Sequence, residues 1–153
     1  MLAKWIQERR DLALFLVRLA FGLIFLLFGG RHVTNLEGYT STFTNAGIPA
    51  PQVLAPIVAY LEILGGAAAI LGIFTRYAGG LLAIVMIVSS TTVKMPAAFS
   101  INPQTNTVRA RDFLGLTNFW DIDLSLFTMG VVLLLMGPGR WALEYALFKR
   151  EIT

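Results

Sequence analysis

Two charged residues, Arg18 and Glu62, interrupt long apolar runs of this 153-residue chain. Arg18 lies within the run 12–30 and Glu62 within the run 53–74. Apolar surroundings disfavour the charged form of a carboxyl, and a neutral carboxylic acid can donate a proton or a hydrogen bond. Glu62 is therefore a candidate ligand or proton site, for example toward a quinone carbonyl. The alternative is a structural carboxyl that holds its helix against a neighbour.

Arg18 is the second candidate for a ligand or proton site. On helices that rise about 1.5 Å per residue, Arg18 and Glu62 differ in depth by about 9 Å. The Cα–Cβ bond tilts toward the helix N-terminus, which directs Arg18 away from Glu62. A direct pair is therefore possible but not favoured by geometry, and the alternative is that Arg18 extends to the membrane surface.

A second polar group, which we call the outer cluster, gathers where the apolar runs end. Negative charge suits a helix N-terminus, a lysine can pair with either aspartate, and a histidine can relay protons. Ordinary interfacial charge is the alternative interpretation. The outer cluster consists of Arg31, His32, Lys94, Asp121 and Asp123.

The composition favours lipid as the solvent for much of the surface. Apolar residues make up 56% of the chain and charged residues 14%, against roughly 45–50% and about 25% in soluble domains. The net charge of +3 is spread over predicted helix ends, so the sequence does not indicate nucleic-acid binding. There is no cysteine and one histidine. Thiol chemistry, Cys-ligated clusters and a bis-histidine haem within one chain are thus excluded, and no metal site is predicted.

Four apolar runs predict an all-α, integral membrane four-helix bundle that forms a single membrane domain over residues 1–153. Each run is near the ~20 residues that cross a bilayer. Seven Lys and Arg residues fall on one predicted side and four on the other, which favours cytoplasmic N- and C-termini. The predicted spans are 12–30, 53–74, 77–93 and 119–137, with extramembrane loops 31–52 and 94–118 and a short cytoplasmic amphipathic tail, 140–153.

Small residues gather in the second and third spans. Only Thr75 and Arg76 separate these spans, so the two helices must be antiparallel neighbours. Small residues four apart let membrane helices approach closely, which predicts a tightly packed hairpin. The alternative is that glycine is simply common in membrane helices. The predicted packing residues are Gly65, Gly66, Ala69, Gly72, Gly79, Gly80 and Ala83.

An ordered set of short motifs resembles the DoxX family of small four-helix membrane proteins over nearly the whole chain. The chain departs from the family pattern at Arg31 and His32, where relatives often have Lys, and at Lys94, where many have His. The motifs are Arg18-Leu19 with Gly22, Phe25 and Gly29; Gly47-Ile48-Pro49 with Pro51; Glu62 with Gly65-Gly66; Gly72 to Arg76; and Gly137 to Arg140.

The resemblance implies a bacterial or archaeal inner-membrane location and an association with quinone or thiol redox metabolism. Relatives include subunits of thiosulfate:quinone oxidoreductase and a membrane partner in thiol-related oxidative defence. The first hypothesis is therefore a redox-associated subunit that contacts quinone or anchors a partner enzyme, with no covalently bound cofactor and no self-contained catalytic site. The expected partners are the lipid bilayer and other membrane or periplasmic subunits, or further copies of the chain. The alternatives are a non-catalytic structural or assembly subunit and a small proton-coupled transporter.

Overall fold

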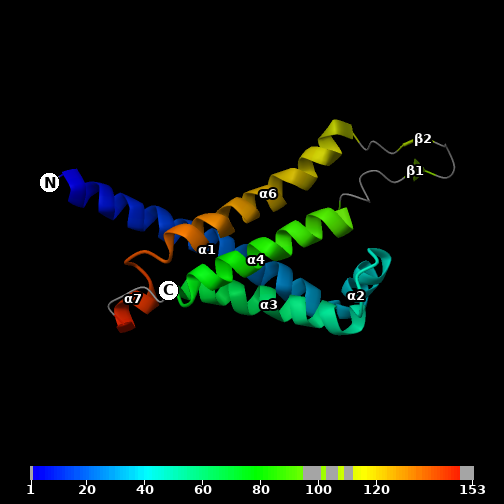
Figure 1. Cartoon of the computed structure of the whole chain (residues 1–153), viewed down its shortest axis with the longest axis horizontal. Helices are drawn as coiled ribbons and strands as arrows, with labels where there is room; N and C mark the ends of the chain where they lie inside the picture. The colour runs from blue at the N-terminus through cyan, green and yellow to red at the C-terminus, as the bar shows by residue number, and fades with distance from the viewer. Residues whose placement is uncertain (1, 95–100, 103–106, 109–111, 149–153) are drawn as a thin grey trace.

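Helices make up almost all of the computed structural model, which describes residues 2–94, 101–102, 107–108 and 112–148. Figure 1 shows α2 and the two short strands at one end of the molecule and α7 at the other. We call these the pocket end and the tail end. The elements are α1 (Leu2–Thr34), α2 (Leu36–Asn45), α3 (Pro51–Leu71), α4 (Thr75–Ser89), the π-helix η1 (Ser90–Lys94), β1 (Ile101–Asn102), β2 (Thr107–Val108), α6 (Asp112–Met136) and α7 (Leu143–Phe148).

The long helices α1, α3, α4 and α6 form a membrane bundle, as predicted. Within the described residues three stretches are long and apolar enough to cross a membrane, namely Arg9–Thr34, Pro51–Leu71 and Thr75–Val93. The fourth helix, α6, contributes the shorter apolar stretch Ile122–Met136. Large apolar side chains face outward, including Leu27, Leu64 and Leu135, which are 64%, 65% and 70% exposed. Such a surface suits lipid rather than water. The prediction of an all-α membrane bundle is confirmed.

The segment 31–52 differs from the loop predicted there, because α1 continues to Thr34 and α2 follows at once. Asn35 caps α2 by accepting a hydrogen bond from the Gly38 backbone N–H at 3.3 Å, which satisfies one of the unpaired N–H groups of the first turn. The pair Gly47 and Ala50, both with positive φ, then redirects the chain into α3. In the segment 94–118, likewise predicted as a loop, β1 pairs with β2 and α6 already begins at Asp112.

The bundle consists of two closely packed helix pairs, α1 with α3 and α4 with α6. Phe21 and Phe25 of α1 meet Leu82 of α4 and Leu126 and Leu133 of α6 in a common buried core. Contact between α3 and α4 is less extensive. Helix pairing is therefore set by side chains far apart in the sequence rather than by the shortest connection.

The predicted packing glycines do lie at helix contacts, but mostly not in the predicted hairpin. Gly65 faces Leu82 of α4, whereas Gly66 lies against the backbone of α1 at Gly22. Gly79 lies against α6, where a Cβ would stand 2.8 Å from the Gly130 carbonyl oxygen. The structure thus corrects the prediction of a tightly packed α3–α4 hairpin. The short turn makes the two helices neighbours, but most of the small residues lie on faces that pack against α1 or α6. The other predicted packing residues also lie inside the bundle or at helix contacts. Ala69 and Ala83 are buried, Gly80 lies against α6, and Gly72 lies at the end of α3 beside Arg18.

We predict that Gly66→Ala destabilises the bundle by about 1–3 kcal/mol, the usual cost of overpacking. The added Cβ would lie 2.7 Å from the Gly22 carbonyl oxygen and 3.0 Å from the Leu26 nitrogen, both backbone atoms that cannot rotate away. The melting temperature of the detergent-solubilised protein measures the effect. The matched control is Gly30→Ala, because a Cβ there meets nothing within 4 Å. Equal melting temperatures for the two variants would contradict the close α1–α3 packing.

Candidate functional site

A cavity of about 580 Å³ lies at the pocket end, between α1, α2, α3, α4, η1 and α6. This volume falls in the usual range for small-molecule sites, roughly 300–1,000 Å³. Apolar side chains form most of the wall, including Phe28, Phe43, Val58, Val85 and Met86. A few polar side chains converge on the same space, which is the composition expected of a ligand pocket.

Glu62 contributes the most deeply buried charge of this cavity, and its partner is His32. The His32 Nδ1 and a Glu62 carboxylate oxygen are 2.6 Å apart, joining α1 to α3. The Glu62 side chain is 3% exposed and that of His32 is 28% exposed, so the histidine forms the accessible side of the pair. When Glu62 is ionised it accepts from the Nδ1–H, which leaves Nε2 as the ring nitrogen for a ligand.

Tyr39 of α2 completes this wall. Its ring is stacked on the His32 imidazole, with centroids 3.8 Å apart and planes 3° from parallel, and it makes a T-shaped contact with the Phe43 ring, with centroids 4.9 Å apart. Burial, and then the negative charge of Glu62, raise the pKa of Tyr39 above its ordinary value, so its hydroxyl remains a hydrogen-bond donor at neutral pH. The stack fixes the plane of the histidine ring.

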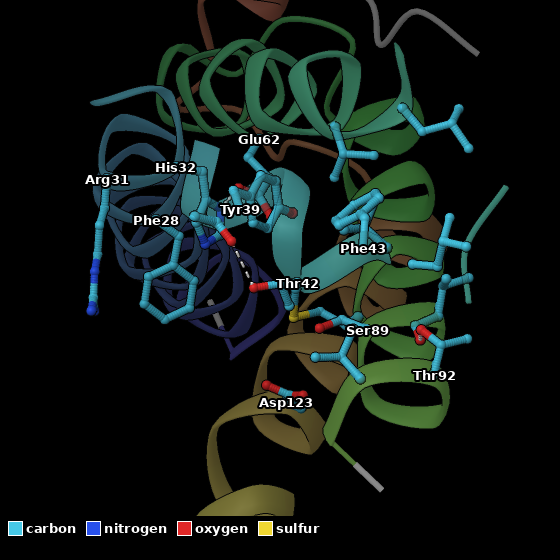
Figure 2. A pocket seen from close by; sticks show the side chains of 18 of the residues that line it. Phe28, Arg31, His32, Tyr39, Thr42, Phe43, Glu62, Ser89, Thr92 and Asp123 are labelled. Atoms are coloured by element: carbon cyan, nitrogen blue, oxygen red, sulfur yellow. Dashed lines mark hydrogen bonds and ion pairs between the residues drawn. The ribbon is translucent and has the colours of Figure 1, made fainter. Parts of the chain in front are cut away.

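Asp123 of α6 lies on the opposite wall, as Figure 2 shows. The residue is 4% exposed, and the Ser90 hydroxyl donates to its Oδ2 at 2.7 Å. Ser90 opens the π-helical turn η1, a departure from α-helical geometry that is common at functional sites. The cavity therefore has two polar walls: His32, Tyr39 and Glu62 come from α1, α2 and α3, whereas Asp123, which accepts from Ser90 of η1, comes from α6.

The structure brings together three members of the outer cluster. Arg31, His32 and Asp123 all line the cavity, with Arg31 at its exposed edge. The side chains of Lys94 and Asp121 lie outside those that the structure describes. Within the described ranges, no three His or acidic residues are arranged to hold a metal ion.

One side of the cavity reaches the apolar surface of the bundle. Ile84 and Val88 line it and are 60% and 45% exposed, and both belong to the apolar stretch Thr75–Val93. A molecule dissolved in lipid would meet the cavity at this side. The exposed lining residues Arg31, Asn35 and Gly38 mark the other side, beyond the apolar part of α1.

Arg18 occupies a different place, at the tail end. It is fully buried and donates from Nη2 to the Trp141 carbonyl oxygen at 2.7 Å. Its guanidinium carbon lies 5.8 Å from the centre of the Phe15 ring. Arg18 does not line the cavity and does not pair with Glu62, so the two candidates do not share one site.

The segment that receives Arg18 is also held by other polar contacts. The Glu144 backbone N–H donates to the Gly72 carbonyl oxygen at 3.2 Å, and the Glu144 carboxylate accepts from the Phe74 N–H at 3.0 Å. Asp11 accepts from the Arg140 N–H at 3.3 Å. These contacts attach the chain before and within α7 to α1 and to the turn between α3 and α4. The described surroundings of Arg18 are therefore those of a structural residue.

The sequence analysis does not single out Tyr39 and Phe43, because the apolar runs alone predict a loop over residues 31–52. The signal that predicts their helix is the apolar spacing Leu36, Tyr39 and Phe43, which places one apolar side chain per turn on a single face. The preceding Asn35 supplies the N-cap. The Ser90–Asp123 contact joins residues 33 positions apart and leaves no local pattern.

Comparison with known proteins identifies the family. The family model of DoxX matches residues 13–95, from α1 through η1. The chain belongs to the DoxX family. It is 32% identical to an uncharacterized membrane protein of Mycobacterium tuberculosis over 141 residues, which cover 88% of this chain and 80% of that protein. It is also 31% identical to the Bacillus subtilis protein named "Putative oxidoreductase CatD" over 94 residues, 61% of this chain and 69% of that protein. No solved structure matches the chain.

We predict that His32 and Glu62 are energetically coupled by about 1–3 kcal/mol, as expected for groups in direct contact. Stability is measured by reversible denaturation of the variants His32→Ala and Glu62→Leu and of the double variant. The double variant should lose less than the sum of the single losses, because His32→Ala leaves a buried carboxyl without its partner. A parallel cycle of Glu62→Leu with Thr128→Ala should be additive, since the exposed Thr128 donates within its own helix. Additivity in both cycles would exclude a direct pair.

Proposed function

We propose that this DoxX protein binds a membrane quinone in the cavity at the pocket end and acts as the quinone-contacting subunit of a redox system. The observation that carries the proposal is the His32–Glu62 pair, which places a histidine nitrogen with a buried carboxylate behind it in an apolar cavity. The exposed lining residues Ile84 and Val88 provide a route from lipid, where isoprenoid quinones dissolve. The name of the Bacillus subtilis relative supports a redox role in general terms.

The chemical fit concerns both the ring and its oxygens. A quinone head group is flat and apolar over most of its surface, which suits Phe28, Val85 and Met86 in the cavity wall. Its carbonyl oxygen accepts hydrogen bonds, and the Nε2 of a protonated His32 is a charge-assisted donor. Glu62 stabilises the positive charge of that imidazolium. The stacked Tyr39 ring keeps the imidazole from rotating, so the donor direction is fixed before a ligand arrives.

Proton transfer is the chemical step that the residues of this chain supply. A bound quinone takes up two electrons and two protons on reduction to a quinol. His32 holds one of these protons at Nε2 and, after giving it up, is recharged from the exposed side of the cavity. The chain contains no cysteine and a single histidine, which rules out Cys-ligated clusters and a bis-histidine haem within it. The proposal therefore assigns electron transfer to a partner enzyme. A thiol donor fits the balance, because two thiols that form one disulfide release two electrons and two protons.

We predict that menadione, a para-naphthoquinone, binds the purified protein, and that His32→Ala and Glu62→Gln weaken binding by about tenfold. This factor corresponds to about 1.4 kcal/mol, close to the contribution of one charge-assisted hydrogen bond. His32→Ala removes the donor, and Glu62→Gln replaces the carboxylate that contacts the histidine Nδ1 at 2.6 Å and orients the donor. Isothermal titration calorimetry in detergent, with the heat of empty micelles subtracted, measures the affinity.

Tyr60→Phe is the matched control for this titration. Tyr60 lies on α3 two residues before Glu62, is 54% exposed and does not line the cavity. Its substitution should leave menadione affinity unchanged. Absence of saturable binding by the wild-type protein, or equal affinities for all four proteins, would be incompatible with the proposed quinone site.

The proposal places the protein in a bacterial or archaeal inner membrane with both termini in the cytoplasm. We predict that green fluorescent protein fused after Thr153 is fluorescent and that alkaline phosphatase fused there is inactive, because the fluorophore matures in the cytoplasm and the phosphatase does not. The same two reporters fused after residue 104, between α4 and α6, should give the reverse result. Phosphatase activity at Thr153 would reverse the orientation and put the cavity on the cytoplasmic side.

A further inference from the structure

The cavity has a mouth on the side that faces the apolar surface, which the function proposed above uses only as a route of entry. Ile84 and Val88 of α4 line the cavity there and are 60% and 45% exposed. We propose that the isoprenoid chain of a bound quinone leaves the cavity through this mouth, so that Ile84 and Val88 determine whether chain-bearing quinones bind. This inference rests on the proposed function and adds the substrate class to it.

The mouth lies at the depth of the hydrocarbon core. Both residues belong to the apolar stretch Thr75–Val93, which ends on the side of the pocket end. At a rise of about 1.5 Å per residue, Ile84 lies roughly 13 Å below Val93, close to half the ~30 Å thickness of the core. Leu81, which is 41% exposed, continues the same face of α4 toward the centre of the membrane. A chain that leaves beside Ile84 therefore enters lipid rather than the head-group region.

The other described boundaries of the cavity suit a chain less well. Toward the tail end, Met86 lines the cavity and belongs to the buried core that includes Phe25 and Leu82, both 0% exposed. At the opposite edge, the exposed lining residues Arg31 and Asn35 lie beyond the apolar part of α1, where a chain would meet head groups or water. The side next to Ile84 and Val88 is therefore the one that an apolar chain would take.

The pairing of the long helices explains why the mouth lies beside α4. Contact between α3 and α4 is less extensive than contact within the α1–α3 and α4–α6 pairs. Figure 1 shows α3 and α4 diverging from their connecting turn toward the pocket end. Leu54 and Val58 of α3 also line the cavity and are half-buried. Branched aliphatic side chains from both helices thus border this side of the cavity, which suits contact with an isoprenoid chain.

A chain-bearing quinone needs such a mouth because lipid and aliphatic side chains are almost equally apolar. The chain gains little by exchanging lipid for a protein interior. A chain forced into a closed cavity would overpack it, which lowers an affinity by about tenfold or more. An open mouth lets the head group reach His32 while the chain stays in lipid. Closing it should therefore exclude quinones that carry a chain and spare those that lack one.

The experiment compares menadione with menaquinone-2, which carries the same ring with a short isoprenoid chain. Calorimetry in detergent measures both affinities for full-length wild type, Ile84→Trp, Val88→Trp and the control Ile87→Trp. The ratio of the two affinities is compared between proteins, so partition of each probe into micelles cancels. Ile84→Trp and Val88→Trp should weaken menaquinone-2 relative to menadione by about tenfold, because the large ring fills the mouth. Ile87 is 47% exposed on the same helix and does not line the cavity, so Ile87→Trp should leave both affinities unchanged.

The outcomes separate this inference from the quinone site itself. A selective loss of menaquinone-2, with menadione still bound saturably, shows that the variants fold and supports the inference. An equal loss of both probes, no loss of either, or the same loss in Ile87→Trp overturns it. If wild type binds menadione but not menaquinone-2, the inference fails and the quinone site stands. If wild type binds neither, both proposals fall.

A further probe tests whether the mouth belongs to a lipid chain instead. Farnesol is an isoprenoid chain without a quinone ring, and wild type should not bind it saturably. Saturable farnesol binding that Val88→Trp abolishes and Ile87→Trp preserves would assign the mouth to a lipid chain and overturn the inference.

Discussion

The hydrogen bond between His32 and Glu62 is the interaction on which the pocket end depends. A charged side chain near the centre of a membrane costs at least about 2.5–3.5 kcal/mol unless a partner offsets it. Glu62 is almost completely buried, and the partner that it contacts is His32, at 2.6 Å. For this contact to form, α1 must remain helical beyond its apolar part, as it does to Thr34. The cap at Asn35 then starts α2, which carries Tyr39 onto the imidazole ring.

The cavity itself is a consequence of how the four long helices pair. Glycine contacts bring α1 against α3 and α4 against α6, and the less extensive contact between α3 and α4 leaves room between the pairs. At the tail end the chain around α7 fills this region, held by Arg18, Glu144 and Asp11. At the pocket end no described segment fills it in the same way, and α2 lines the cavity there. Each pair therefore supplies one wall, with His32 and Glu62 on the first and Asp123 on the second.

The sequence predicted those features that depend on local pattern or on the solvent. Apolar length identified the membrane helices, and the placement of Arg31, His32 and Asp123 at span ends anticipated that they would share one level. It could not predict helix partners, because small residues are found on several faces of α3 and α4, and the pattern does not show which face meets which neighbour. For the same reason the sequence leaves Arg18 as a possible partner of Glu62, whereas the structure places His32 beside Glu62. The spacing of Leu36, Tyr39 and Phe43 predicts the helix α2. A search for long apolar spans does not use this spacing and therefore misses the helix.

Arg18 and Glu62 represent two solutions to one energetic problem. Arg18 gives a hydrogen bond to a backbone carbonyl in a fully packed region, where Nε and Nη1 find no partner among the described residues. That arrangement joins the C-terminal part of the chain to α1, and Arg18 does not line the cavity at the pocket end. Glu62 instead contacts His32, a side chain that is partly exposed to the cavity. The partner that stabilises the Glu62 charge is therefore also a group that can bind a ligand and donate or accept a proton. A carboxyl with only a packing role would not need a partner that faces a cavity. The difference in surroundings, rather than the charge itself, therefore separates the structural residue from the candidate functional one.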